Sequence, residues 1–335
     1  MNLEKNVLVF SVITLICSAS NFLDDEWKLW KSKYGKQYKN EEEEIFRRNV
    51  WEENWRTIHK HNTLANQGLK KYTLIANHFA DMTSQERTQK SRMPCPKLNA
   101  PKAAVFQGQP VKRMSGYPEI PEEVDWRNSG CVSPVKNEGD FCDVSWAFSV
   151  VGVLESRYCL KNNELFSFSE QQLIDCLGSC CGGDPELSFE HVDEVGLMQS
   201  KDYEYTQTAF TCLYNPEDAV KINITKFYSL NRNGNIAKVL AVDGPVAVFL
   251  KVGNDFHFYN GGIYGDDSED AECSNSIAQT VTFIGYGSEC GTDYWLLKNS
   301  WGNEWGEKGY GRINRVPSRC VSTFRVVTAE IGDSE

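Results

Sequence analysis

Histidine is scarce in this sequence of 335 residues, and so are the usual metal-binding patterns of cysteine. Of five histidines only His191 and His257 follow Cys131, and no pair of C-x-x-C units is present. Structural zinc sites combine such units with one another or with paired histidines. We therefore expect no metal site, and no motif of the sequence indicates another cofactor.

Long apolar runs are also absent beyond the first twenty residues, which excludes ordinary membrane-spanning helices there. The N-terminus, MNLEKNVLVFSVITLICSAS, has a lysine, a mostly apolar run from Val7 to Cys17, and small residues around Ala19. That order is typical of a secretory signal peptide, predicted here over residues 1–19, although an ordinary buried helix is the alternative. A signal peptide predicts a secreted or lysosomal protein.

Cysteine, in contrast, is plentiful. Twelve cysteines are present, of which eleven lie beyond Cys17 and ten run from Cys131 onward. In an exported chain, an even set of cysteines usually forms a disulfide framework.

Basic and acidic residues are unevenly distributed along the chain. Residues 1–119 contain 19 Lys and Arg against 13 Asp and Glu, whereas residues 120–335 contain 16 against 33. The first part should therefore attract the second, and the acidic second part should repel nucleic acid and anionic membranes. We expect no nucleic-acid partner.

The chain changes character after its first third. Residues 20–115 are rich in helix formers and end in an aperiodic stretch, Pro94 to Met114, which is typical of an exposed linker. In residues 116–335, Ser145 to Leu160 predicts a buried helix, and Ser169 has the spacing of a capping box before a second one. The last hundred residues predict strands: PVAVFLKV, TVTFIGYG, DYWLLKNSW and GYGRINR. Helices followed by strands predict an α+β fold of two lobes with a cleft between them.

One expected helix of the first part has a distinctive face. Its members are Glu43, Arg47, Trp51, Asn54, Ile58 and Asn62, three or four residues apart, so all six project from one side. Asparagine is a poor helix former that needs partners when covered, so this face should be covered. A plain amphipathic helix with chance polar neighbours is the alternative.

These features together resemble the papain-like cysteine proteases of the cathepsin L type. The helical row, with Val50, is similar to the family's propeptide pattern E-x3-R-x2-(V/I)-(F/W)-x2-N-x3-I-x3-N, and ANHFADM, Ala76–Met82, to its G-x-N-x-F-x-D motif, with Ile75 in place of glycine. The matching motifs of the second part are, in order, VDWRNSG, PVKN, WAFS, FSEQQLIDC, GPVAV, GIYG, GYG and YWLLKNSWGNEWGEKGYGRI. The resemblance implies a papain-like fold, a helical lobe plus a β-barrel-like lobe, preceded by a helical inhibitory propeptide.

The resemblance also implies where the catalytic residues should be. Such enzymes use a thiolate, a histidine that takes its proton, and an asparagine that orients the histidine. WAFS places Ser145 at the nucleophile position, and QTVTFIGYG places Gln279 at the histidine position. Asn299 keeps the asparagine, Trp301 keeps the tryptophan that covers it, and Glu138 stands at the oxyanion-hole glutamine.

These replacements predict a loss of proteolysis. A serine hydroxyl is far more basic than a thiol and needs a general base, and the amide of Gln279 accepts no proton near neutral pH. Glu138 should add negative charge where a developing oxyanion needs a donor. One extra residue also precedes Cys142, and the family's Gly-Ser after that cysteine has become Asp143-Val144.

Other positions gain expected roles from the resemblance. Cys180-Cys181-Gly182-Gly183 resembles the C-x-G-G wall, whose glycine backbone pairs with an extended peptide, although a tight turn that needs glycine is equally consistent. The family pattern implies disulfides Cys142–Cys180, Cys176–Cys212 and Cys273–Cys320. Cys131, Cys159, Cys181 and Cys290 are additional to this pattern, and we expect a fourth bridge between Cys131 and Cys159. Asn223 begins an N-x-T sequon, which is a glycosylation site or a chance triplet.

Three functions remain open. The first is a monomeric pseudoprotease that binds its own propeptide and a peptide or protein ligand in the cleft, which includes an active papain-family protease as a target. The second is a hydrolase that uses Ser145 with a non-standard base, for which His257 and His191 are poor candidates and more typical of packing or surface residues. The third is a structural or storage protein.

Overall fold

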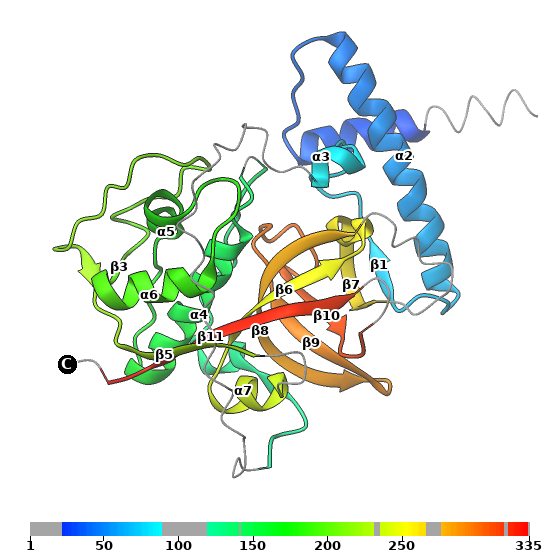
Figure 1. Ribbon diagram of the computed structural model, residues 1–335. Helices are drawn as coiled ribbons and strands as arrows, with labels where there is room; N and C mark the ends of the chain where they lie inside the picture. The colour runs from blue at the N-terminus through cyan, green and yellow to red at the C-terminus, as the bar shows by residue number, and fades with distance from the viewer. Residues whose placement is uncertain are drawn as a thin grey trace, which may run out of the picture.

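The structure is a computed structural model that describes residues 22–88, 119–140, 142–230, 235–265, 276–317 and 321–333. The predicted signal peptide and the stretch from Pro94 to Met114 lie outside the described residues. Figure 1 shows a leader of helices, a helical lobe around α4, and a lobe built on a curved sheet. No helix within the described ranges is both long and apolar enough to cross a membrane.

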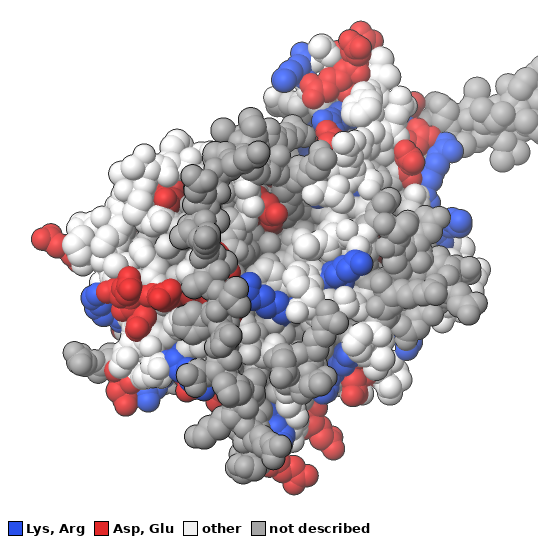
Figure 2. Space-filling model, in the orientation of Figure 1, with Lys and Arg blue, Asp and Glu red and all other residues white. Residues whose placement is uncertain are grey.

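The leader consists of a helical segment over residues 22–33, then α2 (Glu41–Asn66), β1 (Tyr72–Leu74) and α3 (Ser84–Thr88). Asn40 caps α2 by accepting a hydrogen bond from the backbone of Glu43. Trp27 packs against Trp51 with ring centroids 5.5 Å apart, and so joins the two long helices. In Figure 2 the leader, at the top of the view, has acidic and basic side chains next to one another.

The face of α2 that the sequence singled out is covered, as expected. Trp51 and Ile58 are almost fully buried. Asn54 donates to the carbonyls of Ala80 and Met82, and Asn62 both donates to and accepts from the backbone of Leu74. The row is therefore the surface that holds the extended part of the leader, rather than a plain amphipathic face.

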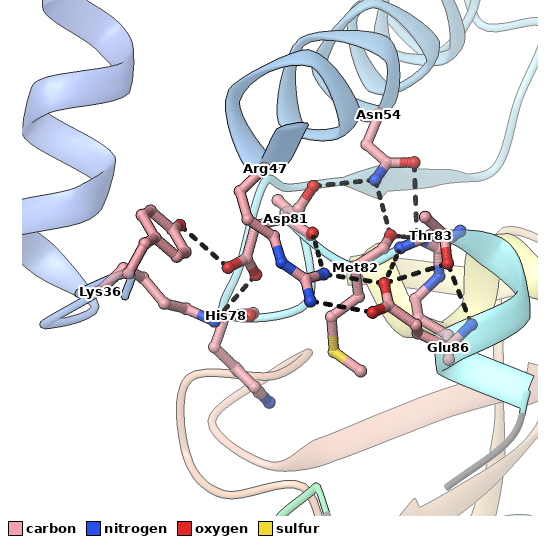
Figure 3. A network of polar contacts seen from close by, with 11 residues as sticks. Lys36, Arg47, Asn54, His78, Asp81, Met82, Thr83 and Glu86 are labelled. Atoms are coloured by element: carbon pink, nitrogen blue, oxygen red, sulfur yellow. Dashed lines mark hydrogen bonds and ion pairs between the residues drawn. The ribbon is translucent and has the colours of Figure 1, made fainter. Parts of the chain in front are cut away.

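Ion pairs complete this attachment (Figure 3). Arg47 makes two hydrogen bonds to Glu86, of 2.8 and 2.9 Å, and donates to the carbonyl of Asp81. Lys36 contacts the Asp81 carboxylate at 2.8 Å. Burial alone would raise the pKa of Glu86, but the hydrogen bonds from Arg47 and Thr83 outweigh it and lower the pKa to about 2.

The helical lobe is organised around one buried helix. It contains η1 (Trp126–Ser129), α4 (Ser145–Asn162), α5 (Glu170–Leu177), α6 (Pro185–Val195) and the short pair β3 (Leu197–Met198) and β4 (Ala219–Val220). Helix α4 begins at Ser145, and every residue from Ser145 to Cys159 is buried, including the charged Glu155 and Arg157. Ser169 caps α5 by accepting from the backbone of Gln172, as its capping-box spacing predicts.

The second lobe is a mostly antiparallel sheet. Its members are β2 (Val124–Asp125), β5 (Ile224–Leu230), β6 (Val246–Val252), β7 (Tyr259–Tyr264), β8 (Ile277–Glu289), β9 (Thr292–Lys298), β10 (Tyr310–Asn314) and β11 (Ser322–Ile331), with α7 (Ile236–Val242) and η2 (Asn254–Phe258) between strands. The strand order is β1-β7-β10-β9-β8-β6-β11-β5, and β2 pairs with β8. Strands β6, β8, β9 and β10 lie where the sequence predicted strands, so the α+β expectation is confirmed.

The leader and the sheet lobe share one core. Strand β1 adds to the sheet beside β7, with Tyr72 opposite Gly262. A side chain at Gly262 would collide with the backbone of Lys71, and its φ of +91° also requires glycine. The buried cluster that contains Trp51 and Phe79 of the leader continues into Trp301 of the sheet lobe.

Disulfides fasten the helical lobe. The structure contains Cys131–Cys159, Cys142–Cys180 and Cys176–Cys212, and the proposed Cys273–Cys320 pair lies outside the described residues. Cys181 is disulfide-bonded as well, so Cys290 is the only free thiol in the described part of the chain.

Candidate functional site

Ser145 lies at the junction of the two lobes. It is the first residue of α4 and is only 4% exposed, and its hydroxyl oxygen accepts a hydrogen bond of 3.3 Å from the backbone N–H of Thr280 on β8. The helix N-terminus would favour a thiolate at this position. A serine hydroxyl gains little from it, because the hydroxyl keeps its proton at neutral pH.

The histidine and asparagine positions also meet. Gln279, on β8, donates through Nε2 to Oδ1 of Asn299 at 3.2 Å, and both side chains are buried. Asn299 Oδ1 also accepts from the backbone of Ser300, whereas its Nδ2 has no partner among the described residues. The pair therefore keeps the orienting hydrogen bond of a catalytic dyad without any group that takes up a proton.

Glu138, at the expected oxyanion-hole position, lies between two hydrogen-bond donors. Its side chain is fully buried, and its two carboxylate oxygens accept from the indole N–H of Trp301 at 2.9 Å and the hydroxyl of Ser300 at 2.6 Å. The donors of Trp301 and Ser300 hold this carboxylate inside the protein. It offers no N–H to an oxyanion in either case, because a carboxylate only accepts.

His257 is a packing residue and not an exposed base. It is fully buried on η2, its ring is stacked on Trp301 at 4.7 Å with an interplanar angle of 7°, and its Nδ1 lies 3.2 Å from the carbonyl of Asn254. His191 is half-buried on α6, where burial lowers its pKa. No hydrogen bond joins either histidine to Ser145 in the described structure.

The leader reaches the site from the other side of Trp301. Phe79 lies edge-on to the rings of Trp301 and His257, at centroid distances of 5.3 and 5.1 Å. Asn77 fixes this position by donating to the carbonyl of His257 at 2.7 Å. Trp301 is thus held between Glu138, His257 and the leader.

The expected glycine wall, Gly182 and Gly183, is a tight turn packed against Trp146. Gly182 has a φ of +104° and pairs with Ser179, so the segment is a tight turn. A side chain at Gly183 would come within 2.4 Å of the ring of Trp146, so glycine is required there by packing. Gly183 itself makes no backbone hydrogen bond to another described residue.

Comparisons with known proteins decide the family. The model of the papain family cysteine protease matches residues 120–329, and that of the cathepsin propeptide inhibitor domain (I29) matches residues 27–86. The chain belongs to the papain family. Within this family it is 35% identical over 317 residues to a cathepsin L-like proteinase of Fasciola hepatica, covering 92% of this chain and 93% of the relative.

Other papain-family proteins are similar to this chain over about nine tenths of its length. Testin-2 of Mus musculus is 37% identical over 328 residues, covering 91% of this chain and 93% of the relative. Among solved structures, the digestive procathepsin L 3 of Tenebrio molitor larval midgut superposes with a TM-score of 0.79 at 30% identity, covering 92% of this chain and 99% of that chain. As in that procathepsin, a propeptide domain precedes the papain-family domain here.

Beneath the site of this papain-family chain lies a buried charged cluster. Lys136 contacts Glu155 at 2.8 Å and Glu170 at 2.7 Å, and Lys298 donates to Ser133. Burial raises the pKa of Glu170 well above the ordinary value near 4.5, although Lys136 opposes the shift. Among the described residues no group of His, Cys, Asp and Glu side chains has the arrangement of a metal site.

Glu170 should make stability depend on pH. Its pKa is higher in the folded than in the unfolded chain, so its contribution is fully present below pH 4.5 and is lost as the pH rises through the raised value. From pH 5 to pH 8 the unfolding free energy of the parent should decrease. Glu170→Gln should remove a part of this decrease on the order of 1 kcal/mol. Thermal unfolding at both pH values checks this, with Glu190→Gln, an exposed change on α6, as control. Equal pH dependence in the parent and Glu170→Gln chains would contradict it.

Proposed function

We propose that this chain is a catalytically inactive papain-family protein that is exported and acts by binding a peptide or protein in its cleft. The observation that carries the proposal is the hydrogen bond from Gln279 to Asn299, in which an amide donor takes the place of the proton acceptor. The division into a signal peptide over residues 1–19, a leader and linker over residues 20–115 and a papain-like domain over residues 116–335 is part of the proposal.

Three separate losses support inactivity. Ser145 has no base, Gln279 cannot act as one, and Glu138 provides no donor for an oxyanion. Removal of triad members alone typically leaves about 10³- to 10⁴-fold acceleration over water, and the oxyanion hole that supplies much of this remainder is also altered here. A hydrolase that uses Ser145 would need another base, and no described histidine contacts it.

Binding groups persist where the catalytic groups are lost. The backbone of Gly183 makes no hydrogen bond to another described residue, and the leader places Phe79 against Trp301 and Asn77 on the carbonyl of His257. The ligand is a peptide held at this backbone, or an active papain-family protease that the leader segment engages. Asn223 is exposed, and its Nδ2 donates to the carbonyl of Asp333. It is the glycosylation site that we propose for the exported protein.

The parent chain should hydrolyse no peptide above background. After its linker is cut by an added serine protease that is then inactivated, a fluorogenic peptide library should give the same signal for the parent and for Ser145→Ala. Turnover that disappears only in Ser145→Ala would overturn the proposal and make Ser145 a working nucleophile. If turnover is absent, a pull-down from native fluid distinguishes a binding protein, with one specific partner, from a structural or storage protein.

A further inference from the structure

Cys181, next to the glycine wall, is half-buried and takes part in a disulfide. Its backbone N–H donates to the hydroxyl of Ser179 at 3.0 Å, and its backbone pairs with Asp143, two residues before Ser145. The bond of Cys181 therefore lies beside the nucleophile position. The other described cysteines either bond one another or, at Cys290, carry a free thiol, so the partner of Cys181 is a cysteine outside the described residues.

The number of cysteines limits this partner to a few positions. Eleven cysteines lie beyond Cys17. The three described bridges use six of them, Cys290 is free, and Cys181 needs one partner. The remaining cysteines are Cys95, Cys273 and Cys320, because Cys17 itself belongs to the predicted signal peptide.

The starts of β8 and β11 favour a bond between Cys273 and Cys320. Both strands run antiparallel to β6, and Lys251 of β6 lies opposite Ala278 on one side and Ser322 on the other. Strands two places apart in a sheet are about 10 Å apart. Cys320 precedes the first residue of β11 by two residues, and Cys273 precedes that of β8 by four. The pairing that the family pattern implies is therefore within reach, which leaves the cysteine of the linker for the wall.

Cys95 follows the docked leader closely enough to reach the wall. Seven residues separate it from the last residue of α3, and they span at most about 25 Å. Helix α3 lies against η2, because Asn254 donates to Ser84 at 2.6 Å. From η2 the contacts continue through Trp301 to Glu138, in the segment that leads into α4. The wall pairs with this same segment, so only a few layers of contacting side chains separate α3 from the wall.

We propose that Cys95 of the linker and Cys181 beside the glycine wall form a disulfide that ties the leader covalently to the papain-like domain. Its formation removes one proton and one electron from each thiol. A disulfide of a thiol oxidoreductase accepts both electrons and both protons and becomes a dithiol. The bond persists in an oxidising compartment, so the inference rests on the export that the proposed function includes. A cut between residues 98 and 119 then leaves the leader attached, and reduction is needed to release it.

Peptide mapping without reduction tests the bond directly. The full chain is expressed with its own N-terminus in animal cells, free thiols are blocked with N-ethylmaleimide at acidic pH, and the denatured protein is digested with trypsin. We expect residues 93–97, MPCPK, to be joined to residues 162–201, which contain Cys181, and to be released by reduction. If a different peptide takes the place of residues 93–97, or if N-ethylmaleimide is found on Cys181, the proposal is overturned.

A cut in the linker shows the consequence of the bond. After limited trypsin digestion, chains whose only new N-terminus lies between residues 98 and 119 should give one band in a non-reducing denaturing gel and two after reduction. Cys95→Ser should lose the leader without reduction, whereas Cys290→Ser, which removes a free thiol, should behave as the parent. Two bands from the parent without reduction, or one band from Cys95→Ser, would overturn the proposal. If Cys95→Ser does not fold, the peptide map of the unmodified chain still decides.

The outcomes separate this tether from the export on which it rests. If Cys131–Cys159 is intact while Cys181 bonds to another cysteine or to none, the tether is wrong and export stands. If the chain stays inside the cells with all of its thiols blocked by N-ethylmaleimide, export is wrong, and the tether lacks the environment that it needs. Neither result depends on whether the cleft binds a peptide.

Discussion

Restoring three residues together should turn this chain into a protease. We expect the combined variant Glu138→Gln, Ser145→Cys and Gln279→His to hydrolyse a fluorogenic peptide at least about 10³-fold faster than the parent. The scaffold needed for this is in place. Helix α4 begins at residue 145, which therefore lies at its N-terminus. Asn299 already accepts a hydrogen bond from residue 279 at 3.2 Å.

The contribution of Glu138 can be measured within the same series. The variant with only Ser145→Cys and Gln279→His should be about 10²- to 10³-fold slower than the triple variant, because it lacks an oxyanion donor. A glutamine at position 138 has one acceptor oxygen for Trp301 and an amide nitrogen for Ser300, whose hydroxyl can accept as well as donate. The second N–H of that amide is the donor that the carboxylate lacks, and the triple variant tests whether it serves an oxyanion.

Controls distinguish restored chemistry from contamination. Activity of the triple variant should be lost on treatment with iodoacetamide, which alkylates a reactive thiolate, and it should be absent when Ser145→Ala replaces Ser145→Cys. Equal rates in the double and triple variants would show that Glu138 does not limit catalysis. Failure of the triple variant, with its fold intact, would place the remaining defect in Asp143-Val144 or in the extra residue before Cys142.

The fold could be predicted from the sequence because its signals are local. Ser169 and Gln172 lie three residues apart, so the start of α5 can be predicted from a short window. The same holds for the face of α2, since Asn54 and Asn62 repeat along one helix and their burial requires partners. Motif order then fixed the register of Ser145 and Gln279 without any knowledge of distant contacts.

The state of Glu138 could not be predicted, because its partners are distant in the sequence. Ser300 lies 162 residues away, and only the folded chain brings its hydroxyl and the indole of Trp301 to the carboxylate. From the sequence alone, Glu138 was expected only to add negative charge where an oxyanion needs a donor. The burial of His257 against Trp301 has the same origin, since it depends on how η2 packs across the sheet lobe.

Removal of one leader side chain should detach the leader. Phe79 is 2% exposed and fills the space beside Trp301 and His257, so Phe79→Ala should cost about 3–5 kcal/mol of docking free energy. The backbone N–H of Ile75 reports on docking directly, because it donates to the carbonyl of Phe258 at 2.7 Å. We expect hydrogen exchange at this amide to become at least about 10²-fold faster.

A matched control exists within the same leader. Phe22→Ala makes the identical change at a side chain that is 53% exposed, so the exchange of the Ile75 amide should change little. The Arg47–Glu86 pair should still hold the leader's internal fold at pH 4. The pKa of Glu86 is lowered from 4.5 to about 2, so its stabilisation is complete above pH 4.5 and is lost gradually as the pH falls from there through about 2. Acidification to pH 4 should therefore leave the leader folded, whereas Phe79→Ala undocks it. Equal exchange of the Ile75 amide in the two phenylalanine variants would show that Phe79 does not anchor the leader.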